Sequence, residues 1–401
     1  MKRIFVFLLV LVVVGISQAS VVNDANLRTA VINRLNLDAN FPTINPSDTN
    51  RPTATDMNWP SFISLDANHL GISDLTGLNY ATNLKTLRLS NNNIAGLDLL
   101  LNLTKMQYLY LDGNPSINSL LPLSGMTDMR NLRISGGNVM NISVVSNFKK
   151  LLWLHLSDNV ITDITPIADI NTLKYLYLAS NNISDINTLA DPDVNKLTEL
   201  DLSDNIISNI QALSNLTKLM NLKMRYNNIT DINSLRGLTG LKYLYLSGNL
   251  DLEDINAVKD MNSLVELALT DTNVSDISVL GDVNQIQFLW LGYNMIQDIN
   301  ALTKFTNLSA LSLSYNPLSF ESYCTYLKTI INNKPSASIA SNIFINDRFT
   351  DVNDLRVFAS KWLRQDCSLS NGDCGGADFS EDGKVDFYDF AIFANWWMYP
   401  H

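Results

Sequence analysis

Asparagine recurs along this chain at a nearly fixed interval, and that interval constrains the fold more than any other feature. Most intervals are 22 residues, and the asparagines stand at Asn92, Asn114, Asn159, Asn181, Asn205, Asn227, Asn249, Asn294 and Asn316. Each follows an L-x-L segment and precedes further apolar positions, as in residues 173–186. A unit of this length cannot bury its apolar side chains alone, so neighbouring units must stack into a solenoid.

Each residue type in the repeat has a physical role. The alternating L-x-L segment predicts a short strand with its leucines inward and the intervening residues outward. The asparagine amide both donates and accepts, so we expect a buried ladder of amides where the chain turns inward. Leu70, Gly137 and Thr272 replace asparagine in three repeats, and intervals of 23 or 24 residues precede Gly137, Asn205 and Thr272. We therefore expect twelve repeats from Leu70 to Asn316, with the extra residues in loops.

The closing I-x-D-I segments, such as residues 161–164 and 296–299, resemble the repeats of bacterial internalin-like leucine-rich-repeat proteins. The resemblance covers about residues 59 to 320. It implies a shallow arc with parallel strands on the concave side, and it implies no particular ligand.

The N-terminal segment has the pattern of an export signal. Lys2 and Arg3 precede an apolar run over residues 4–16, and Ser17 and Ala19 supply a small-x-small cleavage site. This pattern predicts a signal peptide over residues 1–19, although a buried core helix is the alternative. The run is too short to span a membrane. We expect a secreted or cell-surface bacterial protein without membrane insertion after signal removal.

The ends of the solenoid need covers, because the outermost repeats expose their cores. Asp24 is placed to cap a helix within an N-terminal helical cap over residues 20–58, ahead of repeats over residues 59–318. Ser319 is placed to cap a one-sided helix over residues 320–331, within a C-terminal cap and linker over residues 319–340.

Charge and cysteine content limit the partners and the chemistry. The chain has a formal net charge of −11 and therefore lacks the basic surface that binding to nucleic acids requires. Three cysteines in an oxidising compartment leave one without an intrachain partner. We expect a disulfide between Cys367 and Cys374, which flank a short polar loop, and an unpaired Cys324; the alternative is that all three are reduced.

Residues 378–389 carry oxygen ligands at the spacing of a calcium-binding loop. Gly383 occupies the sixth position, where such a loop turns sharply, and a cation that takes about six to eight oxygens suits this spacing. The predicted ligands are the side chains of Asp378, Ser380, Asp382, Asp386 and Asp389 with the backbone carbonyl of Lys384. The alternative is a surface turn without metal.

The last part of the chain also contains an internal duplication. Residues 354–363 match the segment that follows the calcium loop, at an offset of 35 residues. With aspartate at loop position twelve and one exiting helix, this pattern resembles a bacterial type I dockerin over about residues 343 to 398. The resemblance implies a small all-α module, residues 341–401, that uses calcium and docks onto a cohesin-type partner. By analogy Phe387 and Tyr388 would face that partner, or else pack between the two helices.

The first copy of the duplication departs from the dockerin pattern. Ile343 and Ile345 replace the oxygen ligands at positions one and three, and Arg348 replaces the glycine. We expect this copy to bind calcium weakly or not at all.

The strand register places large aromatic side chains on the concave face. They are Tyr108, Tyr110, Trp153, His155, Tyr175, Tyr177, Tyr243, Tyr245, Phe288 and Trp290, where His155 is included as a ring. Exposed aromatic residues on a rigid sheet make good anchors for a ligand. We expect a protein or peptide ligand, with a glycan as the second choice; alternatively, neighbouring rings only cover one another.

Catalysis has little support in the sequence. The three histidines, His69, His155 and His401, have no partners at metal-ligand spacing, and no catalytic motif appears. Glu199 and Asp201 could form a hydrolase pair, but neighbouring outward positions on one strand suit that chemistry poorly. The sequence therefore predicts an α/β solenoid, a leucine-rich-repeat arc with helical caps and a small all-α calcium-binding module. We expect a non-catalytic binding protein whose calcium loop either docks a partner or serves only as a structural cap or sorting tag.

Overall fold

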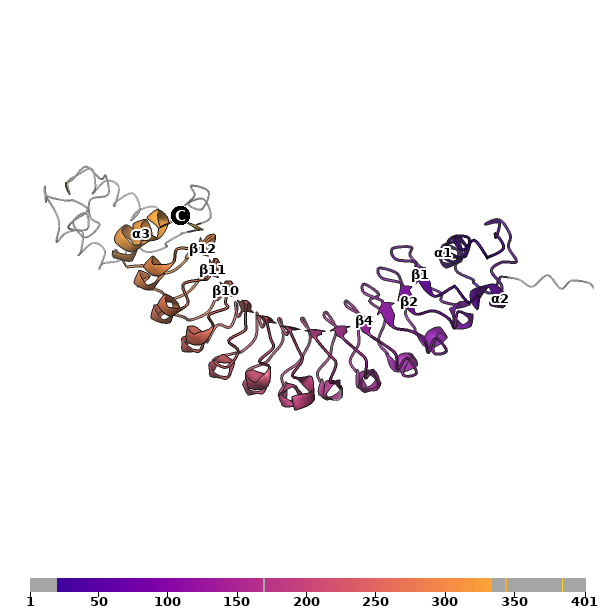
Figure 1. Ribbon diagram of the computed structural model, residues 1–401, viewed down its shortest axis with the longest axis horizontal. Coiled ribbons are helices and arrows are strands. Elements are labelled where there is room, and N and C mark those ends of the chain that lie inside the picture. The colour runs from indigo at the N-terminus through magenta and orange to yellow at the C-terminus, as the bar shows by residue number, and fades with distance from the viewer. Residues whose placement is uncertain (1–19, 169, 320, 334–342, 345–383, 385–401) are drawn as a thin grey trace, which may run out of the picture.

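The computed structural model describes residues 20–168, 170–319, 321–333, 343–344 and 384, and these form a curved solenoid (Figure 1). Short parallel strands line the inner side of the arc, and single helical turns line the outer side. Helices α1 (Ala25–Leu35) and α2 (Ala54–Met57) lie at the N-terminal end, and α3 (Leu327–Asn332) lies at the C-terminal end. Within the described residues, no helix is long and apolar enough to cross a membrane.

The strands form one parallel sheet in sequence order. They are β1 (Ser64–Asp66), β2 (Thr86–Arg88), β3 (Tyr108–Tyr110), β4 (Asn131–Arg133), β5 (Trp153–His155), β6 (Tyr175–Tyr177), β7 (Glu199–Asp201), β8 (Asn221–Lys223), β9 (Tyr243–Tyr245), β10 (Glu266–Ala268), β11 (Phe288–Trp290), β12 (Ala310–Ser312) and β13 (Ile343–Phe344). The twelve predicted repeats correspond to β1–β12, which confirms the repeat count.

Most repeats return along the outer side through a 3₁₀ turn. These turns are η1 (Leu78–Tyr80), η2 (Asp98–Leu100), η3 (Leu121–Leu123), η4 (Ser143–Asn147), η5 (Thr165–Ile167), η6 (Asn187–Ala190), η7 (Pro192–Val194), η8 (Gln211–Asn215), η9 (Asn233–Leu235), η10 (Asn256–Asp260), η11 (Ser278–Asp282) and η12 (Asn300–Lys304). The repeat with the 24-residue interval contains both η6 and η7, so its extra residues lie in an additional turn on the outer side.

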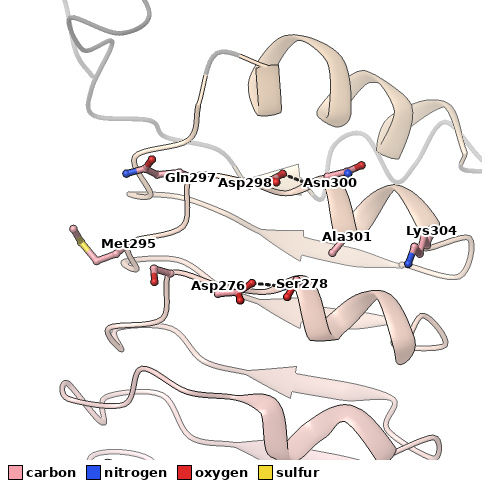
Figure 2. Close-up of a pocket in the computed structure, with 9 residues that line it drawn as sticks. Asp276, Ser278, Met295, Gln297, Asp298, Asn300, Ala301 and Lys304 are labelled. Carbon is pink, nitrogen blue, oxygen red and sulfur yellow. Dashed lines mark hydrogen bonds between the residues drawn. The ribbon is translucent and has the colours of Figure 1, made fainter.

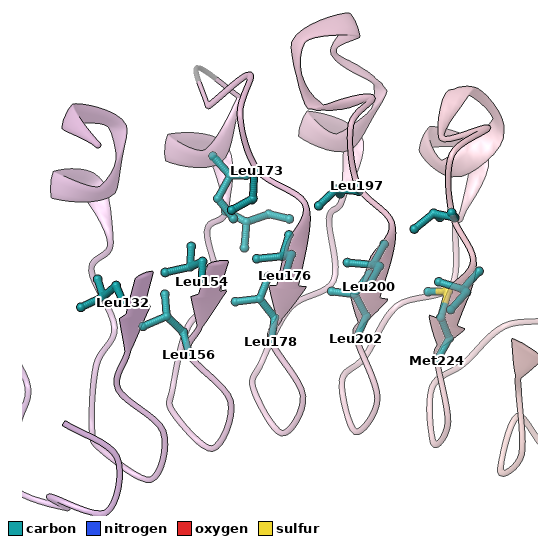
Figure 3. Close-up of a cluster of buried hydrophobic side chains, with 14 of the residues drawn as sticks. Leu132, Leu154, Leu156, Leu173, Leu176, Leu178, Leu197, Leu200, Leu202 and Met224 are labelled. Carbon is teal, nitrogen blue, oxygen red and sulfur yellow. The ribbon is translucent and has the colours of Figure 1, made fainter. Parts of the chain in front are cut away.

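The core is a stack of inward leucines and isoleucines. Leu154, Leu176 and Leu200 occupy the same position on successive strands, and each is at most 1 % exposed. Figure 3 shows these side chains in rows that run from one repeat to the next. Because every strand contributes to the same rows, no repeat has a core of its own.

The asparagine ladder is confirmed by its hydrogen bonds. The Asn181 amide nitrogen donates to the carbonyl oxygens of Leu156 and Leu178, each at 3.0 Å. Its amide oxygen accepts the backbone N–H of Ile161 at 3.0 Å. Each ladder asparagine therefore ties its own repeat to the preceding one, and the same pattern recurs at Asn92, Asn114, Asn159, Asn205, Asn227, Asn249, Asn294 and Asn316.

After the first repeat, where Leu70 occupies the position, two repeats lack the ladder asparagine, and the repeat before each compensates. Gly137 and Thr272 both follow a repeat with one extra residue directly after its asparagine. In those preceding repeats the backbone N–H of Ile117 donates to the Asn114 carbonyl, and that of Leu252 to the Asn249 carbonyl, each at 3.1 Å. These N–H groups need no acceptor from the next repeat, so glycine and threonine are tolerated there.

The residue before each ladder position adopts a left-handed backbone. Positive φ angles occur at His69, Asn91, Gly113, Gly136, Asp158, Ser180, Asp204, Tyr226, Gly248, Asp271, Tyr293 and Tyr315. Glycine, asparagine and aspartate tolerate this conformation, whereas it is strained for a bulky residue. Three tyrosines in the column are therefore unexpected.

Both predicted capping side chains accept backbone N–H groups. The Asp24 side chain accepts the N–H groups of Asn26 and Leu27 at the start of α1, which confirms Asp24 as the N-cap. At the other end, the Ser319 hydroxyl accepts the N–H of Ser322 at 3.2 Å. The chain continues as a π-helical turn, η13 (Ser322–Tyr326), before α3, so the predicted helix begins with a wider turn.

The sequence did not predict β13. Ile343 and Phe344 pair in parallel with Leu311 and Ser312 of β12 and extend the sheet by one strand. The prediction placed these two residues at the start of the C-terminal module.

Candidate functional site

The concave face presents the ten predicted ring side chains at outward strand positions. Each of β3, β5, β6, β9 and β11 has a buried central leucine flanked by two outward residues. Tyr108 and Tyr243 are the most exposed of the set, at 37 % each, and the others are half-buried. The predicted outward placement is confirmed, and the binding role of these residues stays a prediction.

The first aromatic cluster lies on β5 and β6. The Trp153 ring centroid is 4.6 Å from that of Tyr175 and 5.2 Å from that of Tyr177. His155 meets Tyr177 edge-on at 5.5 Å. The rings cover part of one another's surface, as the alternative interpretation expected, and this packing also fixes their orientation.

A hydrogen bond to the next strand holds the first cluster. The Tyr177 hydroxyl donates to Glu199 Oε2 of β7 at 2.7 Å. Burial, and then the Glu199 carboxylate, raise the pKa of Tyr177 well above its ordinary value. Asp201, the other outward residue of β7, lies 3.6 Å from Lys223 Nζ on β8. The Glu199 and Asp201 carboxylates therefore have partners on opposite sides of β7, an arrangement that does not favour a hydrolase pair.

The second aromatic cluster is organised around Glu266 on β10. Glu266 accepts the Tyr245 hydroxyl at 3.1 Å and the Trp290 indole N–H at 2.9 Å. The Arg225 guanidinium lies 4.5 Å from the centroid of the Tyr245 ring. Burial and the Glu266 carboxylate raise the pKa of Tyr245 to about 12. Sequence reasoning missed Glu266, although the strand register that located the rings also places it outward.

His155 has an electrostatic environment that the sequence did not predict. Its Nδ1 lies 4.0 Å from Asp112, and Arg133 Nε lies 2.9 Å from the same carboxylate. Burial lowers the pKa of His155, while Asp112 opposes that change and Arg133 adds to it. The lowered pKa favours the uncharged ring, and the role of His155 as a contact residue stays a prediction.

A third group of rings lies beside the strand ends. Tyr226 is 57 % and Tyr293 is 50 % exposed, and Tyr293 stacks on Tyr315 with the ring centroids 4.1 Å apart. A Cβ atom on Gly248 would lie 2.2 Å from Cδ1 of Tyr226, so the Tyr226 ring lies directly over this glycine. The sequence placed these tyrosines beside the concave strands, but it did not predict their left-handed backbone.

A cavity of about 500 Å³ lies between the strand ends and the outer turns of two neighbouring repeats. Figure 2 shows Asp276 and Asp298 within its lining, and they accept the N–H groups of Ser278 and Asn300 at 2.8 and 2.7 Å. The Ser278 N–H lowers the pKa of Asp276. These bonds begin the turns η11 and η12, so the two carboxylates have a structural role.

Several predicted site residues fall where the structure gives no description. The calcium ligands other than Lys384, the docking residues Phe387 and Tyr388, the cysteines Cys367 and Cys374, and the signal peptide lie outside the described residues. Lys384 is exposed. In the part of the chain that is described, no group of three histidine, cysteine, aspartate or glutamate residues could hold a metal ion.

Family models for leucine-rich repeats match three stretches of the chain. The model described as "Leucine rich repeat" matches residues 171–229 and 195–250, and "Leucine Rich repeats (2 copies)" matches residues 82–125. No curated protein matches the chain by sequence.

Solved structures with the same fold include two from Listeria monocytogenes. An internalin (inlF) superposes with a TM-score of 0.73 at 25 % identity, covering 84 % of this chain and 99 % of the internalin chain. The functional domain of InlJ gives a TM-score of 0.51 at 19 % identity, covering 77 % and 78 % of the two chains.

A plant structure shares the fold over a smaller part. The leucine-rich-repeat ectodomain of the Arabidopsis thaliana membrane receptor kinase GASSHO1/SCHENGEN3, in complex with Casparian Strip Integrity Factor 2, gives a TM-score of 0.58 at 23 % identity. The match covers 64 % of this chain and 33 % of the receptor chain. From its repeats, its sheet and these similarities, the chain is a leucine-rich-repeat protein with internalin-like structural neighbours.

Proposed function

We propose that this chain is an exported, non-catalytic binding protein whose concave face recognises a protein or peptide ligand. The observation that carries the proposal is the pair of aromatic clusters, each held in one orientation by a glutamate on a neighbouring strand. Rings that are already fixed lose little conformational freedom when a ligand binds, so more of the contact energy appears as affinity. The complex of the plant receptor ectodomain is a precedent for ligand binding by this fold.

The test removes one large anchor from each cluster. Full-length protein carrying Trp153→Ala and Trp290→Ala should lose capture of partners from the source organism's envelope and secreted proteins. Tyr80→Ala is the matched control, because Tyr80 is 43 % exposed but lies in η1, on the outer side. Circular dichroism checks that each variant is folded. Equal capture by the double variant and the wild type would contradict the proposal.

A glycan is the second candidate ligand, favoured by the exposed rings of Tyr226 and Tyr293 and the half-buried ring of Tyr315. Sugars stack on flat aromatic faces, and these rings lie at the border of the sheet. A glycan array separates the two candidates. A face that binds only protein should give no saccharide signal that these tyrosines are needed for.

Turnover of polysaccharide or peptide substrates would instead support the hydrolase interpretation of Glu199 and Asp201.

For the C-terminal segment we propose a calcium loop that docks onto a cohesin-type protein, on the strength of the sequence pattern at residues 378–389. Calorimetric titration of the full chain should show calcium binding that Asp378→Ala with Asp382→Ala removes. Asp373→Ala, outside the loop, is the control. If calcium binds but no cohesin-type partner is captured, the segment is a structural cap or sorting tag, which is the alternative.

A further inference from the structure

The central part of the concave face carries a concentration of carboxylates. Residues 153–158, 175–180 and 199–204, which comprise β5–β7 and the loop residues after them, contain four acidic residues and neither lysine nor arginine. Glu199 and Asp201 are outward on β7. Asp158 and Asp204 are exposed at the left-handed loop positions that follow β5 and β7. We refer to these three segments as the central block.

The cations on the neighbouring strands already have partners. On one side Arg133 pairs with Asp112 at 2.9 Å. On the other side Lys223 lies 3.6 Å from Asp201, and the Arg225 guanidinium lies over the Tyr245 ring. Among the described residues, Asp201 is the carboxylate of the central block that forms an ion pair, so four carboxylates face one paired lysine and the central block retains excess negative charge.

The ionisation of nearby groups supports this excess. Burial, followed by the charges of Asp201 and Asp158, raises the pKa of Asp204, and Arg225 only partly opposes this change. His155 does not neutralise the carboxylates, because burial keeps its ring uncharged at neutral pH.

The same central block contains the first aromatic cluster. The rings of Trp153, Tyr175 and Tyr177 lie on β5 and β6. Asp158 follows β5, and Asp204 follows β7, which pairs with β6 on its other side. Aromatic faces attract cations, most strongly at tryptophan, and carboxylates supply a charge partner. Arginine and lysine also carry apolar stems that pack on rings.

From this juxtaposition we infer that the central block binds a basic side chain, arginine or lysine, of the polypeptide ligand. This inference rests on the proposed peptide-binding function and specifies which type of ligand side chain the central block recognises. The aromatic rings hold the stem and the face of the cation, and the exposed carboxylates of Asp158 and Asp204 bind its charged end.

A random peptide library displayed on phage and panned against the full-length protein tests the inference. Peptides enriched by the wild type should carry arginine or lysine. Asp158→Asn with Asp204→Asn should weaken the binding of a synthetic enriched peptide by roughly tenfold, since two exposed ion pairs are worth about 1.4 kcal/mol together. Asparagine tolerates the left-handed backbone at both positions, so these substitutions preserve the loops.

The matched control is Asp260→Asn with Asp282→Asn, which makes the same charge change in the outer turns η10 and η11. This control should bind the enriched peptide as the wild type does. Replacing the peptide's arginine with uncharged citrulline should cost the wild type roughly tenfold and the Asp158→Asn, Asp204→Asn variant little.

The outcomes separate the inference from the function on which it rests. Enriched peptides without basic residues, or equal binding by the Asp158→Asn, Asp204→Asn variant, would overturn the inference and leave peptide recognition intact. A library that yields no peptide dependent on Trp153 would overturn both.

Discussion

The Tyr177 hydroxyl donates to Glu199 Oε2 at 2.7 Å and so connects the outward side chains of β6 and β7. The two residues lie on neighbouring strands but are not directly opposite each other, because the register pairs Tyr177 with Asp201 and Tyr175 with Glu199. The bond is therefore diagonal across the sheet. It fixes the tyrosine ring against Trp153, 5.2 Å away, so a polar contact determines the shape of an aromatic surface.

Tyr177→Phe should lower the free energy of unfolding by about 1 kcal/mol, because it removes this hydrogen bond and keeps the ring. It should also weaken peptide binding, since the ring loses its tether. Urea unfolding measures the first effect. Tyr175→Phe removes a hydroxyl from the neighbouring outward position and should change stability less; equal effects of the two substitutions would contradict the assigned role.

High pH should destabilise the protein through Tyr245. Its pKa is about 12 in the folded protein, compared with about 10 in an unfolded chain. Between these values the unfolded chain binds fewer protons than the folded one, so the free energy of unfolding falls as pH rises from about 10 to about 12. Tyr245→Phe should reduce this slope in urea titrations at several pH values, whereas Tyr243→Phe on the same strand is the comparison. An unchanged slope would refute the prediction.

Asn181→Ala should destabilise the solenoid by about 3 kcal/mol or more. It leaves the carbonyls of Leu156 and Leu178 and the N–H of Ile161 without their amide partner in the core, and each unsatisfied buried group costs about 1–3 kcal/mol. Asn182→Ala, at the next and exposed position, should stay within about 0.5 kcal/mol of the wild type. Similar losses for both variants would show that the ladder adds no special stability.

Gly248→Ala should be more destabilising than Gly136→Ala. Both glycines have positive φ, 78° and 70°, so both substitutions carry a backbone cost of about 1 kcal/mol or more. Only at Gly248 would the new methyl group meet a ring, 2.2 Å from Cδ1 of Tyr226, whereas the nearest atom at Gly136 is 3.9 Å away. Thermal unfolding should show that Tyr226→Ala rescues part of the Gly248→Ala loss; strict additivity would rule out the contact.

Much of the concave face could be predicted from the sequence, because strand alternation and a constant repeat length together fix which residues point outward. The rings of Trp153 and Tyr245 were located in this way. The bond between Tyr177 and Glu199 was not predicted, since it depends on the side-chain conformations of two residues on different strands. The same register places Glu266 outward, but no sequence pattern marks it as the group that orients Tyr245 and Trp290.

Other features have no periodic signal. Tyr226 has a left-handed backbone although its side chain disfavours one, because the turn of the repeat overrides local preference. The strand formed by Ile343 and Phe344 lies beyond the last repeat of the sequence, so no interval in the chain predicts it.

The extra residue after Asn114 and the glycine at position 137 belong to different repeats, yet each makes the other tolerable. The same holds for the insertion after Asn249 and Thr272. Single repeats of this protein are therefore not interchangeable modules. A recombination event or an engineered deletion could separate an insertion from the replaced ladder position that follows it. One backbone N–H would then lack an acceptor, or one N–H would face two acceptors. At these two places the heritable unit is therefore a pair of adjacent repeats.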